Sequence, residues 1–336
     1  MRYFLGLDAG GTKTFCLVGD ENGNILGFGR AGTGNYEYQG VEPAAIENRK
    51  AVNEALQAAG LSLADISGIG MGIAGADVPE DYTMLEREIY TPLFGDIPRN
   101  FRNDSMGALR GGTREPFGIV IACGTGCVCA GVNPGGQETR VGGLGEEFGD
   151  KCSGSQLGRD GVRDVWRARD GIIPPTLMTD MFIERAGASD LEDFFYRMYR
   201  QEVTYRDLEP SAKIVFDAAF AGDQAACDIL ESGGKYLGEM VNAIARKLNM
   251  TAMEYEVVMA GSVFKGKSPV LMNAFCTELH RVSPMAQPIM PRFEPVVGTL
   301  LMGMELVLKI SDSVYANLTQ SLRATEASSS IRLTGE

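Results

Sequence analysis

The sequence predicts an α/β protein in which two domains of similar topology, each built on a duplicated mixed-sheet core, flank a cleft. Three observations support this fold class. Strand-like apolar runs alternate with helix-like segments along the 336 residues. A strand–turn–strand pattern near the N-terminus occurs again from residue 117. The chain is also long enough for two domains that each bury a core of their own.

The first half opens with two apolar runs joined by a GGTKT turn, and the hairpin turn ENGN leads into a third. A helix follows, because apolar residues recur at near-helical spacing until Gly60, which is a typical stop signal. The elements predicted for this half are strands over 2–9, 15–20, 25–29, 66–75 and 97–104, and helices over 41–60, from about 80, and over 105–112.

The second half repeats this opening at an offset of 113 residues. The stretch 117–137 shows the same order of strand, Gly/Thr turn, strand and Gly-containing turn. A duplicated core with one phosphate loop in each half would explain the repeat, and a chance likeness between two hairpins is the alternative. The sparse identities pair Ala9 with Ala122, Gly11 with Gly124, Thr12 with Thr125 and Gly23 with Gly136.

The remaining segments suggest the domain boundaries. Over 141–170 a glycine-rich loop runs into a helix around Trp166, and residues 176–250 look mostly helical. A last core strand and a last helix are predicted over 255–261 and 295–310. We therefore expect one domain over 1–115 plus 295–322, a second over 116–294 with a helical insertion, and a disordered polar tail over 323–336.

Composition excludes several classes of protein. The 44 acidic and 31 basic residues give a net charge of -13 with no basic run, so nucleic acid and anionic membranes are not expected partners. No apolar stretch reaches the ~20 residues of a membrane span, and no signal peptide is visible, so we expect a cytoplasmic protein.

Seven cysteines, an odd number, indicate free thiols in a reducing compartment. His280 is the only histidine, so a carboxylate is the expected acid–base group.

The first motif that could carry chemistry is LGLDAGGTKT. Its strand ends in Asp8, and two glycines then let successive backbone N–H groups point at one spot, which is typical of a phosphate cradle. Asp8 is placed to hold a Mg²⁺ ion, directly or through water. The spacing fits neither a Walker A loop nor the Rossmann fingerprint, and an ordinary glycine-rich hairpin is the alternative. The candidate phosphate contacts are Gly10, Gly11, Thr12, Lys13 and Thr14.

Two further motifs fit a nucleotide. The CGTG turn, with Gly124, Thr125 and Gly126, can approach a phosphate closely through its backbone N–H groups. The run VVMAGSVF over 257–264 ends a strand in small residues, against which a flat adenine ring could lie.

At these three points the chain resembles the actin/hexokinase/heat-shock-chaperone ATPase superfamily. Within it, the chain is most similar to the BadF/BadG/BcrA/BcrD-type ATPase family and its N-acetylglucosamine kinase-like branch. The ordered set of motifs runs from Leu5 to about Leu308 and includes RNDSMGAL, GGLGEEFGDKCSGS and PVVGTLLMG. The resemblance implies two actin-like (ribonuclease H-like) domains, and it implies ATP and Mg²⁺ as cofactors.

The family also suggests roles for individual residues. Asp8 matches the magnesium-associated aspartate, Asp104 the catalytic base, and Gly261 with Ser262 the adenosine loop. Asn35, Gly143, Asp150 and Asp104 itself match positions that contact the sugar. Two alternatives come from local structure alone: Asp104 could be only the N-cap of a short helix, and Asp150 could only order its loop.

Some residues depart from the kinase pattern. Val128, Leu144, Lys151 and Cys152 stand where other residues are usual in N-acetylglucosamine kinases, which leaves the sugar open. The thiols Cys123, Cys127, Cys129 and Cys152 allow a second interpretation, because another branch of the family uses an iron–sulfur cluster. A zinc site resembling that of repressor/ORF/kinase-type sugar kinases is a third, although it needs a nearby histidine. The simplest interpretation is that Cys127 and Cys129 are small buried strand residues.

The expected reaction is ATP-dependent phosphorylation of a sugar, at the 6-hydroxyl of an amino sugar, an N-acetylated amino sugar or a hexose. The alternative function is an ATP-hydrolysing iron–sulfur activator of a dehydratase or reductase. A sugar-sensing regulator would usually carry a helix-turn-helix, whereas the first strand here is predicted from Arg2. The family resemblance further implies a homodimer.

Overall fold

The computed structural model describes residues 1–208 and 210–324. The chain divides into two compact units: Met1–Val120 with Ile289–Glu336, and Ile121–Pro288. The first two residues of the tail predicted to be disordered, Arg323 and Ala324, belong to a helix instead, and the rest, 325–336, lies outside the described residues. Among the helices that are described, none combines the length and the apolar character needed to cross a membrane.

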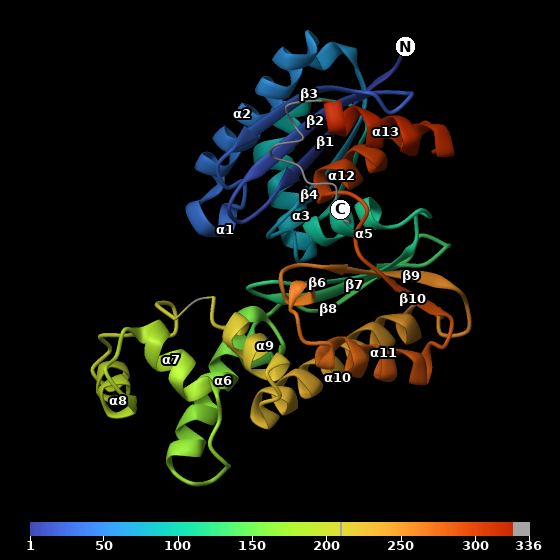
Figure 1. The fold of residues 1–336 in the computed structure, drawn as a ribbon. Coiled ribbons are helices and arrows are strands. Elements are labelled where there is room, and N and C mark those ends of the chain that lie inside the picture. The colour runs from blue at the N-terminus through green and yellow to red at the C-terminus, as the bar shows by residue number, and fades with distance from the viewer. Residues whose placement is uncertain (209, 325–336) are drawn as a thin grey trace. The chain divides into compact units, whose positions relative to one another are not determined.

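The first unit is built on a five-stranded mixed sheet in the order β3-β2-β1-β4-β5. Strand β1 runs antiparallel to β2 and parallel to β4, and β4 runs parallel to β5. The strands are β1 (Tyr3–Ala9), β2 (Thr14–Asp20), β3 (Ile25–Ala31), β4 (Ile66–Ile73) and β5 (Arg99–Asn103). The helices are α1 (Tyr36–Gln39), α2 (Val41–Ala59), α3 (Pro79–Leu85), α4 (Thr91–Phe94), α5 (Asp104–Gly112), α12 (Pro295–Met304) and α13 (Asp312–Ala324), with short turns η1 (Leu63–Asp65) and η2 (Glu86–Tyr90) (Figure 1).

The second unit contains a sheet with the corresponding order β8-β7-β6-β9-β10. The two sheets therefore share one strand order, and the predicted duplicated α/β core is confirmed. Its strands are β6 (Gly118–Cys123), β7 (Cys127–Val132), β8 (Glu138–Gly142), β9 (Tyr255–Ala260) and β10 (Ala286–Ile289). Its helices are α6 (Gly154–Arg169), α7 (Met178–Ala186), α8 (Leu191–Tyr199), α9 (Ala212–Phe220), α10 (Gln224–Lys247) and α11 (Val270–Val282), with short turns η3 (Glu146–Phe148) and η4 (Val263–Lys265).

Four elements differ from the sequence prediction. Helix α6 begins at Gly154, capped by Ser153, within the stretch predicted as a glycine-rich loop. The last predicted helix, 295–310, ends at Met304, and a second helix, α13, follows it. Strands β8 and β10 were not predicted, because β8 is half-buried and polar and β10 has only four residues.

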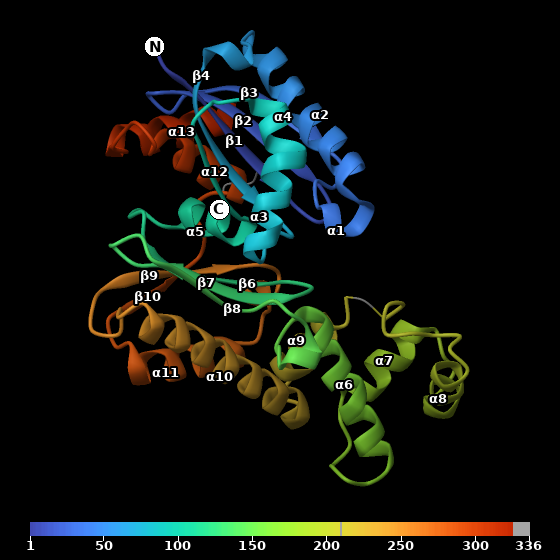
Figure 2. The ribbon, with the colours of Figure 1, turned by 180° about the vertical axis from the view of Figure 1, so that it is seen from behind.

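Helices pack on both faces of the first unit's sheet, because successive side chains of its strands point to opposite faces. In β1, Leu5, Leu7 and Ala9 belong to the core beneath α2, whereas Phe4 belongs to the core beneath α12 and α13. Side chains two residues apart in a strand share a face, so Gly6 and Asp8 point to the same side as Phe4. The two helical layers cover opposite faces of this sheet, as the views from the front and from behind show (Figures 1 and 2).

A strip of glycines lies under α12. Strand β4 reads ISGIGMGI, and the alternate residues Gly68, Gly70 and Gly72 all face α12. A Cβ added at Gly70 would lie 1.9 Å from the carbonyl oxygen of Thr299, and one at Gly6 would lie 2.4 Å from the backbone nitrogen of Leu300. The backbone of α12 therefore rests directly on the backbone of β1 and β4, with no side chain between them. Glycine is required here by close approach and not by a special backbone angle.

We predict that Gly70→Ala destabilises the first unit strongly, because the methyl group cannot be accommodated unless α12 moves off the sheet. A small-to-large change in a packed core typically costs up to about 3 kcal/mol of stability. At Gly70 the added methyl group would collide with a backbone carbonyl, which cannot turn away as a side chain can. Gly135→Ala is the matched control, since a Cβ there would meet only the side-chain oxygen of Asn133, at 3.3 Å. Thermal unfolding of the two variants and the wild-type protein measures the difference. Equal melting temperatures for the two variants would contradict the close packing.

Candidate active site

Two aspartates lie at one edge of the first unit's sheet. Strands β1, β4 and β5 are parallel, so their carboxyl ends meet at the same edge. Asp8 pairs with Gly72, and Asp104 follows directly after β5. Asp8 points to the α12 face, and a Cβ at Gly72 would lie 3.4 Å from the Cα of Asp104. The absence of a side chain at Gly72 therefore lets Asp104 approach the strand that carries Asp8.

The proximity of these groups changes the pKa of Asp8. Burial, and then repulsion by the Asp104 carboxylate, raise the pKa of Asp8 to about 7. Lys13 opposes the shift, and Glu294 adds a smaller repulsion. Near neutral pH the Asp8 carboxyl is therefore divided between its protonated and its charged form. The edge of the sheet has an excess of negative charge, which a cation would neutralise.

Asp104 is not the cap of α5. The N-cap is Asn103, whose side-chain oxygen accepts hydrogen bonds from the backbone N–H of Ser105 at 3.1 Å and from its hydroxyl at 2.6 Å. The interpretation of Asp104 as a pure N-cap is therefore wrong. The amide of Asn103 also donates to Asp77 Oδ1 at 2.9 Å and to the carbonyl of Ala76 at 3.3 Å. Asp77 was missed by the sequence analysis, because no pattern around it marked a site.

Asn35 lies close to the same segment. Its side chain is 4% exposed and caps α1, accepting from the backbone N–H of Glu37 at 2.8 Å. Its amide donates to the carboxylate of Glu37 at 3.3 Å, and a Cβ at Gly75 would lie 2.8 Å from its oxygen. The segment 75–77 therefore contacts both Asn35 and Asn103. Asn35 lies in this unit with Asp8 and Asp104, but its oxygen is already used in the cap.

The first Gly/Thr turn offers only part of the predicted phosphate contacts. Gly10 closes the turn by donating its N–H to the carbonyl of Lys13 at 2.9 Å, so that N–H is not available to a ligand. Gly11, Thr12 and Lys13 are exposed, and the Lys13 ammonium lies 4.2 Å from the ring centroid of Phe15. Thr14 points the other way: it is fully buried, and its hydroxyl has no hydrogen-bond partner among the described residues. Thr14 thus forms part of the core under the turn.

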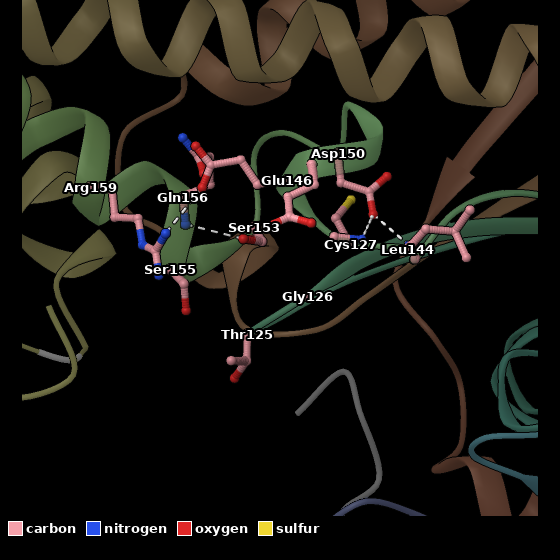
Figure 3. A pocket seen from close by; sticks show the side chains of 13 residues that line it. Thr125, Gly126, Cys127, Leu144, Glu146, Asp150, Ser153, Ser155, Gln156 and Arg159 are labelled. Atoms are coloured by element: carbon pink, nitrogen blue, oxygen red, sulfur yellow. Dashed lines mark hydrogen bonds and ion pairs between the residues drawn. The ribbon is translucent and has the colours of Figure 1, made fainter. Parts of the chain in front are cut away.

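The second unit contains a pocket of about 550 Å³. Three segments form it: the β6–β7 turn, the glycine-rich loop that follows β8, and the first turns of α6 (Figure 3). The residues that line it are Thr125, Gly126, Cys127, Gly143, Leu144, Gly145, Glu146, Glu147, Asp150, Ser153, Ser155, Gln156 and Arg159.

The β6–β7 turn resembles the first turn but is one residue shorter. Gly124 donates its N–H to the carbonyl of Gly126 at 2.9 Å, whereas Gly10 donates to the carbonyl of Lys13, one residue further along the chain. A Cβ at Gly124 or Gly126 would meet no atom within 4 Å, so this turn is open to a ligand. A Cβ at Gly261 would lie 2.2 Å from the carbonyl oxygen of Cys123, which places Gly261 and Ser262 beside the turn. The structure therefore brings two of the predicted nucleotide motifs together.

Asp150 orders the loop that carries it. Its Oδ2 accepts the backbone N–H groups of Leu144 and Gly145, each at 2.7 Å (Figure 3). Asp150 therefore orders its own loop, as one of the two interpretations predicted. A contact between Asp150 and the sugar remains a prediction. Gly143 has a positive φ of 81° and lies against Val128, from which a Cβ would be 3.0 Å away.

The sequence matches a known family over most of its length. Residues 5–303 match the BadF/BadG/BcrA/BcrD ATPase family. The chain belongs to this family. The resemblance stated from the sequence motifs is therefore confirmed.

Relatives of this member of the BadF/BadG/BcrA/BcrD ATPase family include sugar kinases. An N-acetyl-D-glucosamine kinase of Dictyostelium discoideum is 28% identical over 312 residues, which cover 90% of this chain and 97% of the relative. An N-acetylmuramic acid/N-acetylglucosamine kinase of Clostridium acetobutylicum is 29% identical over 264 residues, or 78% and 86% of the two chains. A glucosamine kinase of Vibrio cholerae is 28% identical over 233 residues, or 69% and 76%.

Solved structures share the fold of this family member. A Chromobacterium violaceum protein, proposed to be an N-acetylglucosamine kinase, aligns with a TM-score of 0.67 at 24% identity, covering 90% of this chain and 99% of that one. A ROK hexokinase from Thermus thermophilus aligns with a TM-score of 0.55 at 18% identity, covering 91% and 99%. These likenesses confirm the predicted class of two actin-like domains.

The seven cysteines of this ATPase-family member are free thiols; five are buried, and Cys227 and Cys276 are partly exposed. Cys127 and Cys129 are buried in β7, as the simplest interpretation predicted. The Cys123 thiol donates to the carbonyl of Cys152 at 3.0 Å, and hydrogen bonds with neighbouring thiols together with burial hold its pKa well above its usual range. In residues 1–208 and 210–324, no group of three or more His, Cys, Asp or Glu side chains is placed to hold a metal ion.

The sequence analysis missed several pocket residues. Glu146, Ser153 and Ser155 lie within the GGLGEEFGDKCSGS motif but were given no role, and Arg159 lies beyond it. One signal was present: Arg159 and Arg163 are four residues apart, the spacing of one helix face, and α6 does begin at Gly154, before the helix predicted around Trp166.

The raised pKa of Asp8 predicts a pH-dependent stability. Between about pH 4 and pH 7 the folded protein keeps a proton that the unfolded chain has lost, so the free energy of unfolding falls as pH rises through this window. Asp8→Asn removes the effect, and the variant should exceed the wild-type protein in stability at pH 8 by up to about 4 kcal/mol. The difference should shrink toward pH 4. Urea unfolding with a chelator present, at several pH values, measures it, and a difference that stays constant with pH would count against the raised pKa.

Proposed function

We propose that this protein transfers the γ-phosphoryl group of ATP to a hydroxyl of a sugar. The observation that carries the proposal is the placement of Asp104 beside Asp8 at the edge of the first unit's sheet. Phosphoryl transfer needs a group that positions the metal–nucleotide complex and a carboxylate that meets the attacking hydroxyl. The naming of three relatives as sugar kinases supports the proposal.

The two Gly/Thr turns are proposed to hold the phosphates of ATP. Each turn is closed by its own first glycine, so the N–H groups that follow the glycine are the ones that would meet an anion. These are the N–H groups of Gly11, Thr12 and Lys13 in one unit, and of Thr125 and Gly126 in the other. Gly261 and Ser262 would border the adenosine.

Asp8 is the residue proposed to hold Mg²⁺, directly or through water. The fit rests on charge and chemistry: a partly buried carboxylate whose pKa is raised by burial and by a second carboxylate favours a hard cation with oxygen ligands. When bound, the ion would neutralise charge on the phosphate oxygens. Thr14 is not included among the phosphate ligands, because it is fully buried beneath the turn.

Asp104 is proposed to accept the proton of the attacking hydroxyl. Asn103 takes over the capping of α5, so Asp104 is not required for that purpose. The transition state of phosphoryl transfer is loose, and the hydroxyl loses its proton late, so the base needs no raised pKa. A carboxylate is therefore sufficient, and the reaction does not need the single histidine of the chain, His280.

The sugar is proposed to be an amino sugar, an N-acetylated amino sugar or a hexose that is phosphorylated at its 6-hydroxyl. Val128 and Leu144 differ from the usual kinase residues and lie at or beside the loop that borders the pocket. A screen of ADP release over these three groups of sugars, with Mg²⁺ and ATP, tests the proposal. Sugar-dependent ADP release and a sugar phosphate seen by phosphorus NMR are the expected results, and ATP hydrolysis that no sugar stimulates would contradict them.

Asp104→Asn should reduce kcat by about 10²–10⁴-fold with the best sugar, because the amide keeps the size of the side chain but cannot accept the proton. The melting temperature should stay close to that of the wild-type protein, since Asn103 still caps α5. Asp207→Asn is a control on an exposed turn of the other unit and should leave kcat unchanged. Steady-state kinetics on the wild-type protein and the two variants measure these values of kcat. A kcat of Asp104→Asn close to that of the wild-type protein would rule out Asp104 as the base.

A further inference from the structure

The loop over 142–150 has little intrinsic rigidity. Gly142, Gly143, Gly145 and Gly149 all adopt positive φ values, of 70°, 81°, 101° and 94°. Glycine gives the chain many other conformations, so a segment of this composition needs contacts to keep one of them. The two hydrogen bonds to Asp150 lie within the loop, so they order it internally but do not attach it to the rest of the unit.

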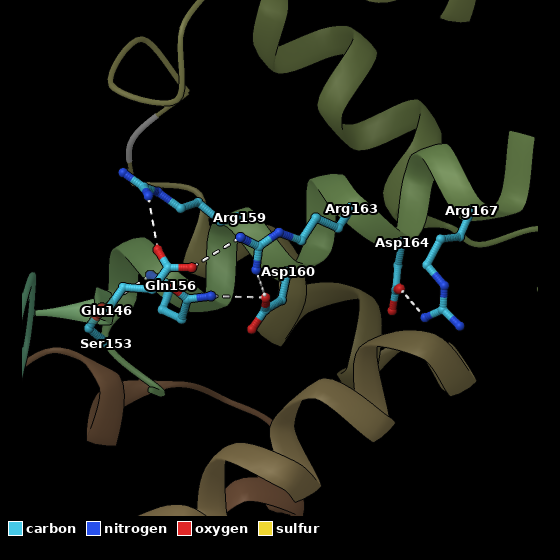
Figure 4. A network of polar contacts seen from close by, with 8 residues as sticks. All are labelled: Glu146, Ser153, Gln156, Arg159, Asp160, Arg163, Asp164 and Arg167. Atoms are coloured by element: carbon cyan, nitrogen blue, oxygen red, sulfur yellow. Dashed lines mark hydrogen bonds and ion pairs between the residues drawn. The ribbon is translucent and has the colours of Figure 1, made fainter. Parts of the chain in front are cut away.

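Glu146 attaches the loop to helix α6. Its Oε2 accepts from Arg159 Nη1 at 3.1 Å, and its Oε1 accepts from Arg163 Nη2 at 3.1 Å. Because the two arginines are four residues apart, one turn of helix separates them and both reach the same carboxylate (Figure 4). The hydrogen bond to Arg163, with the positive charge of both arginines, lowers the pKa of Glu146, so it stays ionised.

Arg163 is itself held in place by α6. Its Nη1 donates to Asp160 Oδ1 at 2.8 Å, and the same oxygen accepts from Gln156 Nε2 at 3.0 Å (Figure 4). Gln156 belongs to the first turn of the helix, where its N–H is capped by the Ser153 hydroxyl at 3.1 Å. The guanidinium of Arg163 is therefore oriented by its own helix toward the loop.

We propose that Arg163, with Arg159, is a positioning residue: it holds Glu146 and thereby fixes the loop 142–150 as one wall of the pocket. The inference rests on the proposed function, because that pocket is taken as part of the sugar site. The loop contributes Leu144, Gly145, Glu146, Glu147 and Asp150 to the lining, whereas Arg163 does not line the pocket. Arg163 therefore acts on a ligand only through Glu146.

The expected effect is local. The side chains of Glu146, Arg159 and Arg163 are between 42% and 50% exposed, and ion pairs in such positions contribute little to global stability. Each ion pair can still shift, by a few-fold, the equilibrium between the observed conformation of the loop and its other conformations. Loss of the pairs should therefore raise the KM for the sugar by about 3–10-fold. The KM for ATP and the melting temperature should not change.

Helix α6 also provides a matched control. Arg167, an arginine about as exposed as Arg163 and one turn beyond it, donates to Asp164 at 2.7 Å, and this ion pair involves no loop residue (Figure 4). Arg167→Gln removes an arginine from the same helix without removing a contact to Glu146. It should behave as the wild-type protein in every measurement.

The experiment compares Glu146→Gln, Arg163→Gln, the double variant and Arg167→Gln. Hydrogen exchange of the peptide over 142–150, in the protein without sugar or nucleotide, should be several-fold faster in the first three than in the control. The sugar KM should rise in the same three variants. The double variant should have a sugar KM no higher than that of the single variant with the higher KM, because Arg163 acts on the loop only through Glu146.

The proposal would be overturned if Glu146→Gln and Arg163→Gln both kept the wild-type hydrogen-exchange rate over 142–150 and the wild-type KM for the sugar. A raised KM with unchanged exchange would also overturn it, since Glu146 would then contact the sugar itself. If the wild-type protein phosphorylates no sugar, the proposed function fails, and the exchange measurement alone still decides whether Arg163 fixes the loop.

Discussion

The direct contact between the backbone of α12 and the backbone of the first sheet is the constraint on which the candidate site depends. Alternate glycines in β4, together with Gly6 in β1, let the two layers touch backbone to backbone at these positions. Gly72 continues this strip to the edge of the sheet, where it leaves room for Asp104 next to the strand of Asp8. The same packing that stabilises the unit thus sets the distance between its two acidic groups and raises the pKa of Asp8.

The second unit repeats the sheet order but places its acidic groups elsewhere. Its Gly/Thr turn is also closed by the N–H of its first glycine, although the turn is one residue shorter than the first. Asp8 is the last residue but one of β1, and the last residue but one of β6 is Ala122. The second sheet therefore has an apolar side chain where the first has a carboxylate. The acidic groups of the second unit's pocket lie on the loop after β8, which depends on α6 for its position.

Much of the fold could be predicted from the sequence, because alternation and glycine placement are local signals. The strand over 66–75, the Gly/Thr turns and the repeat are legible in the order of residues alone. The capping of α5 by Asn103 was not, since Asn103 and Asp104 are adjacent and either could cap a helix. The inward orientation of Thr14 and the contacts of Glu146 depend on tertiary packing. The spacing of Arg159 and Arg163 indicates only that the two arginines share a helix face, not which carboxylate they contact.

A titration of the Asp8 carboxyl by carbon-13 NMR, in metal-free protein, tests most directly whether the packing brings the two aspartates together. The account predicts a pKa of about 7 in the wild-type protein and a lower value in Asp104→Asn, because the repulsion from Asp104 is then absent. An Asp8 pKa that is the same in both proteins, or that lies near the ordinary value of 3.8 in the wild-type protein, would contradict it.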